Sequence, residues 1–130
     1  MNRYIVDTHT LFWYLTASPR LGSQAKAAFD KGARGEAVIY IPVIVLAELF
    51  YLNEKAGRPL DFRAIYEELS GSGQMILLPL MPEDILDFET DANVPEMHDR
   101  IIVGVARRMN ATCLSLDSQI VQSKLVTTIW

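Results

Sequence analysis

The chain has 130 residues, of which half are hydrophobic and 22% are charged, and its formal net charge is −4. A chain of this length fits one domain that buries roughly two thirds of the surface of its unfolded form, so it needs neither a disulfide nor a metal merely to fold, and its composition excludes a disordered protein. The negative charge argues against a general nucleic-acid-binding surface, because phosphate contacts normally come from clustered Lys and Arg.

The first part of the chain reads as alternating strands and helices. A buried strand at Arg3–Val6 precedes a helix over Thr8–Thr16, and a second helix runs from about Gln24 and is closed by Gly32 or Gly35. The next strand is Ala37–Ile41, followed by a long apolar helix from Pro42 to about Ala56, which Gly57 and Pro59 stop.

The second part continues the alternation. A helix at Phe62–Leu69 precedes a strand at Met75–Leu78, and a short helix begins at Pro82. After a loop near residues 93–95, a helix over Asp99–Met109 leads to a strand at Thr112–Leu116, and Val126–Trp130 is the last expected strand. Strands separated by helices imply crossover connections, so we expect one domain over residues 1–130: a three-layer α/β/α sandwich with a mainly parallel sheet of about five strands.

No apolar segment is long enough to span a bilayer, and no basic stretch followed by an apolar run opens the chain, so we expect a cytoplasmic protein without a membrane partner. The single cysteine, Cys113, lies in an apolar run and cannot form an intrachain disulfide. We expect it to be buried and without a chemical role.

Glu48 is the only charge in the apolar run from Val43 to Leu52. Its helical neighbours at three and four residues are apolar, so it does not lie on a polar stripe. Either it reaches solvent at the helix edge, or it is buried and ionised. In the second case it needs a cation or several hydrogen-bond donors.

Asp99 also has apolar helical neighbours, Ile102, Val103 and Ala106. Aspartate is a favoured N-cap residue, and Asp99 stands where its helix is expected to begin, so capping alone is the competing explanation. Gly104, inside the same helix, predicts a close approach of the helix to a strand.

Asp7 and Asp117 each follow an apolar strand, and each could cap the helix after it. In an open parallel sheet, ligands bind outside the carboxyl ends of the strands, where both residues are expected. If the first and fourth strands are neighbours, the two carboxylates approach one another, and the helix starts at Thr8 and Asp99 bring a third acid near them. Several like charges at one place then need a cation.

A site of carboxylates and water suits Mg²⁺ or Mn²⁺. A zinc site is not expected, since the two histidines, His9 and His98, form no HExxH pair and Cys113 stands alone.

Four segments together resemble the PIN domains, especially the VapC-type toxins of toxin-antitoxin pairs, over nearly the whole chain. They are Ile5–His9, Leu46–Leu49, His98–Ile102 and Leu114–Asp117. The resemblance implies a metal-dependent endoribonuclease whose catalytic and metal-binding acids are Asp7, Glu48, Asp99 and Asp117. It also implies an RNA substrate, a cognate antitoxin protein and a homodimer. Thr8, Ser115 and Arg100 are the expected auxiliary or substrate-contacting residues, with a solvated surface position as the alternative for Arg100.

Other classes fit less well. A receiver domain would have adjacent acids after the first strand and a lysine after the last, and a dehalogenase-type phosphatase would have an acid in place of His9. A PIN fold that binds RNA or protein without catalysis stays an alternative. Phe12, Trp13 and Tyr14 cannot all point into one core, so Trp13 or Tyr14 is expected to contact a partner.

Overall fold

A parallel sheet of five strands forms the centre of the computed structural model, with the strands in the order β3-β2-β1-β4-β5. The strands are β1 (Asn2–Val6), β2 (Ala37–Pro42), β3 (Met75–Leu78), β4 (Thr112–Leu114) and β5 (Thr128–Ile129). The helices are α1 (Thr8–Leu15), α2 (Ser23–Ala33), α3 (Val43–Lys55), α4 (Phe62–Gly71), α5 (Pro82–Leu86), α6 (Met97–Met109) and α7 (Ser118–Ser123).

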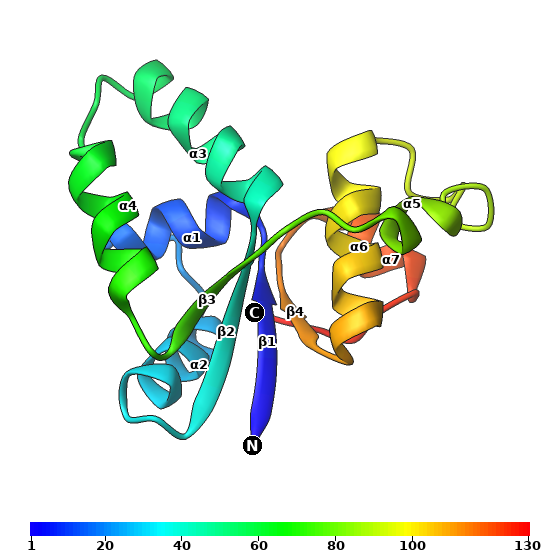
Figure 1. The fold of residues 1–130 in the computed structure, drawn as a ribbon, viewed down its shortest axis with the longest axis horizontal. Coiled ribbons are helices and arrows are strands. Elements are labelled where there is room, and N and C mark those ends of the chain that lie inside the picture. The colour runs from blue at the N-terminus through cyan, green and yellow to red at the C-terminus, as the bar shows by residue number, and fades with distance from the viewer.

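Helices cover the sheet on both sides. In Figure 1, α1 to α4 lie to the left of the central strands and α5 to α7 to the right. The expected three-layer α/β/α arrangement with a parallel sheet is therefore confirmed. The inner strands lack an alternating pattern because both of their faces are covered: Tyr4 to Val6 and Ile39 to Pro42 are buried without interruption.

The core extends through both helical layers. Its largest fully buried side chains include Phe29 and Leu11 from the first layer and Ile102 and Ile120 from the second, with Ile5, Ile39 and Leu114 from the strands between them. Cys113 is buried in this core, as expected, and burial raises the pKa of its thiol well above the usual value. No helix of the structure is both long and apolar enough to cross a membrane.

Several element ends differ from the expected ones. β4 stops at Leu114, because the Ser115 side chain turns to Asp7 and Leu116 is exposed. α6 begins two residues early, at Met97, because Glu96 caps it. Gly32 lies inside α2 against Ile39, and it is Gly35, in a left-handed conformation with φ of 73°, that follows the helix end.

Gly104 does permit a close approach, but the expected partner was wrong. A Cβ atom built on Gly104 would lie 2.8 Å from the carbonyl oxygen of Asp84, in α5. The element that approaches Gly104 closely is therefore a helix and not a strand.

Candidate active site

The pairing of β1 with β4 brings two acids to the same edge of the sheet. Val6 is in register with Leu114, so the chain segments that leave both strands carry Asp7 and Asp117 to that edge. Asp7 is about nine-tenths buried; its Oδ1 accepts a hydrogen bond from the Thr10 backbone N–H at 2.9 Å, and its Oδ2 accepts one from the Ser115 hydroxyl. Asp7 therefore caps α1 with one oxygen and is held by Ser115 through the other.

Asp117 caps α7 in the same manner. Its Oδ1 accepts hydrogen bonds from the backbone N–H groups of Gln119 and Ile120, at 2.9 and 3.1 Å. The Ser115 hydroxyl in turn accepts a hydrogen bond from the Asp117 backbone N–H at 3.0 Å. Ser115 thus links the two acids: it donates to the side chain of one and accepts from the backbone of the other.

Glu48 projects from the middle of α3, and its side chain is 34% exposed. The Thr8 hydroxyl donates a hydrogen bond to its Oε1 at 2.8 Å. Both expectations for Glu48 were therefore partly right, since the side chain has access to solvent but is tied to the start of α1. Thr8 fixes the direction in which this carboxylate points.

Asp99 is the third residue of α6, and capping does not explain it. The cap is Glu96, whose Oε2 accepts a hydrogen bond from the Asp99 backbone N–H at 2.9 Å. Burial, followed by the charges of Asp117, Glu96, Asp7 and Glu48, raises the pKa of Asp99 to about 7. Its carboxylate consequently faces other negative charges with no cationic partner.

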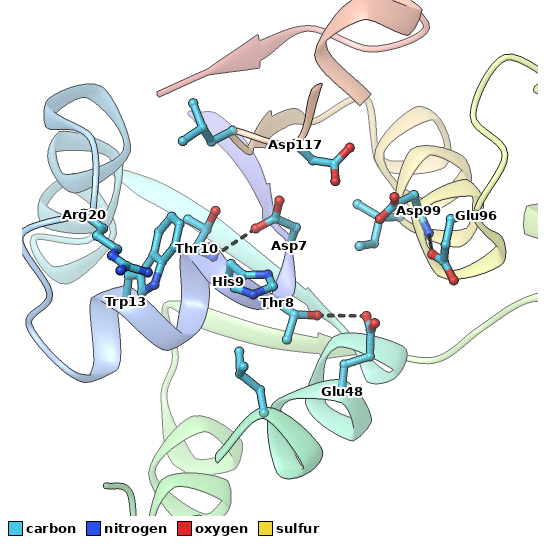
Figure 2. A pocket seen from close by; sticks show the side chains of 13 residues that line it. Asp7, Thr8, His9, Thr10, Trp13, Arg20, Glu48, Glu96, Asp99 and Asp117 are labelled. Carbon is cyan, nitrogen blue, oxygen red and sulfur yellow. Dashed lines mark hydrogen bonds between the residues drawn. The ribbon is translucent and has the colours of Figure 1, made fainter. Parts of the chain in front are cut away.

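All four predicted acids line one open cavity of about 600 Å³. Figure 2 shows Asp7 at the centre, Asp117 and Glu48 on opposite sides of it, and Asp99 beyond them on α6. The remaining lining residues are Thr8, His9, Thr10, Trp13, Arg20, Leu52, Glu96, Ile102 and Leu116. Four chain segments distant in sequence therefore deliver carboxylates to one place.

The donor set fits a hard divalent cation in its chemistry. Every acid at the cavity offers oxygen atoms, and burial together with the negative charges of the neighbouring acids raises the pKa of Asp99. In the structure, however, no three acidic, histidine or cysteine side chains converge closely enough to form a ligand group. The chain thus supplies suitable donors around the cavity without assembling them into a finished site.

A comparison with known protein families identifies the family to which this cavity belongs. Residues 4–124 match the family described as PIN domain. The chain belongs to the PIN-domain family. PIN domains are generally nucleases, so an acidic cavity at the carboxyl edge of the sheet is the expected place for their chemistry.

Solved structures agree on the fold of this PIN domain. VapBC2 from Rickettsia felis, bound to a DNA fragment from its promoter, superposes with a TM-score of 0.70 at 16% identity, covering 98% of this chain and 97% of the other. FitAcB from Neisseria gonorrhoeae gives 0.64 at 16% identity, with 98% and 96% covered. The PIN domain endonuclease Utp24 gives 0.53 at 15%, with 94% and 76% covered. The comparison with curated protein sequences produced no match.

Arg100 does not line the cavity of this PIN domain. Its guanidinium donates hydrogen bonds to the carbonyl oxygens of Phe88, at 3.0 Å, and Val94. It is therefore neither a solvated surface arginine nor directed at the cavity, and it ties the segment before α6 to that helix.

Glu96 is a cavity residue that the sequence analysis missed. Besides capping α6, it accepts a hydrogen bond from His98, which raises the pKa of that imidazole. The available signal was its place three residues before Asp99, the distance over which a capping side chain reaches a backbone N–H. Because the helix was expected to begin at Asp99 and begins at Met97, the capping position fell outside the expected element.

The aromatic residues of α1 are used within the chain. Tyr14 stacks on Phe29 with ring centroids 3.9 Å apart and packs against the core. Its side chain is only partly buried, so a partner contact at Trp13 or Tyr14 stays a prediction. Trp13 lines the cavity and meets Trp130 edge-on at 5.6 Å.

Proposed function

We propose that this PIN domain is a Mg²⁺- or Mn²⁺-dependent endoribonuclease and the toxin of a toxin-antitoxin pair. The single observation that carries the proposal is the cavity at the carboxyl edge of the sheet, which Asp7, Glu48, Asp99 and Asp117 all line and in which the pKa of Asp99 is raised. Membership of a family of nucleases supports hydrolysis of phosphodiester bonds as the reaction.

The protein residues have separable tasks in this reaction. Asp7 and Asp99 would hold the ion, and Glu48 and Asp117 would complete its surroundings directly or through water. Thr8 and Ser115 orient Glu48 and Asp7 by the hydrogen bonds they donate. When bound, the ion would neutralise charge at the scissile phosphate and lower the pKa of an attacking water. Glu48 and Asp99 are only partly buried, so their side chains have room to change rotamer when an ion binds.

A protein partner is the second element of the proposal. The VapBC2 and FitAcB structures support an antitoxin as that partner. Aromatic side chains exposed on neighbouring faces of α3 and α4 are suited to a protein contact: Phe50 is 40% exposed, Tyr51 74% and Tyr66 48%. These faces are the proposed surface for the antitoxin or for a second copy of the chain.

The test is cleavage of a pooled single-stranded RNA by the purified protein. We expect cleavage with Mg²⁺ or Mn²⁺, none in EDTA, recovery on adding either ion back, and no recovery with Zn²⁺. Undiminished cleavage after exhaustive chelation would remove the metal from the mechanism. Binding without cleavage under every metal condition would instead support the non-catalytic RNA-binding alternative.

A further inference from the structure

The cavity has two chemically different ends. Figure 2 shows Asp99 and Glu96 on one side of Asp7, and Trp13 and Arg20 on the opposite side. Five of the lining residues are acids, whereas Arg20 is the only lysine or arginine among them. The acidic end would be occupied by a cation, so the opposite end is the part of the cavity where an anion is electrostatically favoured.

Arg20 carries a guanidinium that no protein group engages. It is exposed, no carboxylate lies within 4.0 Å of it, and its only hydrogen bond outside regular structure is from its backbone N–H to the Ser18 hydroxyl at 3.1 Å. Two other exposed arginines do have carboxylate partners, in the pairs Arg34–Glu36 and Arg58–Glu54. A free guanidinium presents planar donors that match the oxygens of a phosphate.

Trp13 supplies a flat surface beside this arginine. The indole is half-buried and is held by ring contacts with His9 and Trp130, each at a centroid distance of 5.6 Å. Because the ring is already held in place, stacking a base on it would cost little conformational entropy. Bases of single-stranded RNA stack on aromatic side chains while their phosphates bind arginine.

We propose that Arg20 and Trp13 form a subsite for the nucleotide next to the scissile phosphate, with Arg20 on the neighbouring phosphate and Trp13 under its base. The inference rests on the proposed function, because it takes single-stranded RNA as the substrate and the acidic end as the place of cleavage. In this arrangement the subsite sets the direction in which the strand crosses the cavity. It also accounts for RNA binding by an acidic protein through one local contact.

The first experiment compares Arg20→Gln with Arg63→Gln. Arg63 is likewise exposed and has no ion pair, but it lies on α4 outside the cavity, so both variants lose the same charge. Affinity for a short fluorescent single-stranded RNA is measured by anisotropy in Ca²⁺, with the RNA shown to be intact on a gel. Arg20→Gln should weaken binding about tenfold and lower the slope of log affinity against log salt by about one, with Arg63→Gln near wild type.

The second measurement tests the contact itself. RNAs in which one linkage at a time is a neutral methylphosphonate should show one position where the wild type loses affinity and Arg20→Gln loses none. In a Trp130→Phe variant, Trp13 is the only tryptophan left, and RNA should quench its fluorescence; an abasic nucleotide at the stacked position should abolish the quenching. Thermal unfolding verifies that each variant is folded.

The outcomes separate the subsite from the activity. If the wild type cleaves RNA but Arg20→Gln binds it as Arg63→Gln does, the subsite is wrong and the activity stands. If the wild type binds RNA through Arg20 and never cleaves it, the activity is wrong and the subsite stands. Absence of any RNA binding overturns both, and an Arg20 effect confined to binding of a protein partner overturns the RNA subsite.

Discussion

The acids at this site differ in whether they also cap a helix. Asp7 and Asp117 each cap a helix, so replacing either one removes backbone hydrogen bonds as well as a charge. Glu96, and not Asp99, caps α6, and the Asp99 side chain makes no hydrogen bond within the protein. Asp99 is therefore the position at which a loss of charge can be separated from a loss of structure.

Asp99→Asn should abolish metal-dependent RNA cleavage while the free energy of unfolding without metal holds or rises, because the substitution removes repulsion from four neighbouring carboxylates. Stabilisation by added Mg²⁺ should also be lost. Cleavage of pooled RNA and thermal unfolding with and without Mg²⁺ measure these effects.

The matched control is Asp61→Asn, at the cap of α4, where Asp61 accepts from the Ala64 backbone N–H outside the cavity. It should change stability by well under ~1 kcal/mol and leave cleavage intact. Full activity and unchanged metal stabilisation in Asp99→Asn would take Asp99 out of the site.

Sequence was informative for residues whose surroundings are set locally. Asp7 and Asp117 stand at strand ends, and Glu48 interrupts an apolar helix, so each was identifiable from its neighbours. Glu96 and Arg20 could not be identified in this way. Both lie in turns or irregular segments, which have no periodic sequence pattern from which the direction of a side chain can be predicted. The direction of the Arg100 side chain was equally hard to predict, because its guanidinium binds the carbonyl oxygens of Phe88 and Val94 in the segment before α6.

The packing of α5 on α6 holds the helix that carries Asp99. Arg108 donates to both oxygens of the fully buried Asp84 carboxylate, at 2.8 and 3.1 Å, and Arg107 pairs with Asp91 at 2.8 Å. Gly104 lets the backbone of α5 approach α6 between these arginines and the start of the helix. Two ion pairs and one backbone contact therefore fix the position of the helix.

Gly104→Ala should destabilise the protein by about 1–3 kcal/mol, since the new methyl group must displace α5 backbone and overpacking of this kind outweighs the helix propensity of alanine. Chemical denaturation measures the change. Gly71→Ala, at the end of α4, is the control: a Cβ there meets nothing within 4 Å, so that variant should be neutral or slightly stabilised. Equal stability of the two variants would contradict the close contact.

At the scale of the whole molecule, the alternation of strands and helices was enough to predict a parallel three-layer fold. The order of the strands could not be predicted from the sequence, because local patterns do not determine which strands pair. The proximity of Asp7 and Asp117 was predicted only on the condition that β1 and β4 are neighbours. In the structure these two strands do pair. The position of the acids relative to one another is thus a property of the fold, and so is the electrostatic cost of bringing them together.

That cost should appear in the pH dependence of stability without metal. The pKa of Asp99 is about 7 in the folded chain against an ordinary 3.8, so between these values the folded state binds more protons than the unfolded state, and stability falls as pH rises. His98, whose pKa is also raised, loses its contribution as pH rises through its folded value, in the same direction.

The comparison with Asp99→Asn isolates the first effect. Chemical denaturation in EDTA at a series of pH values between 4 and 8 should show the wild type losing stability relative to the variant up to about pH 7, with a constant difference above it. Saturating Mg²⁺ should flatten the wild-type curve, because a bound cation favours the ionised carboxylate. Parallel curves in EDTA would mean that Asp99 is not repelled by its neighbours in the folded protein, and the electrostatic argument for a cation at this cavity would fail with it.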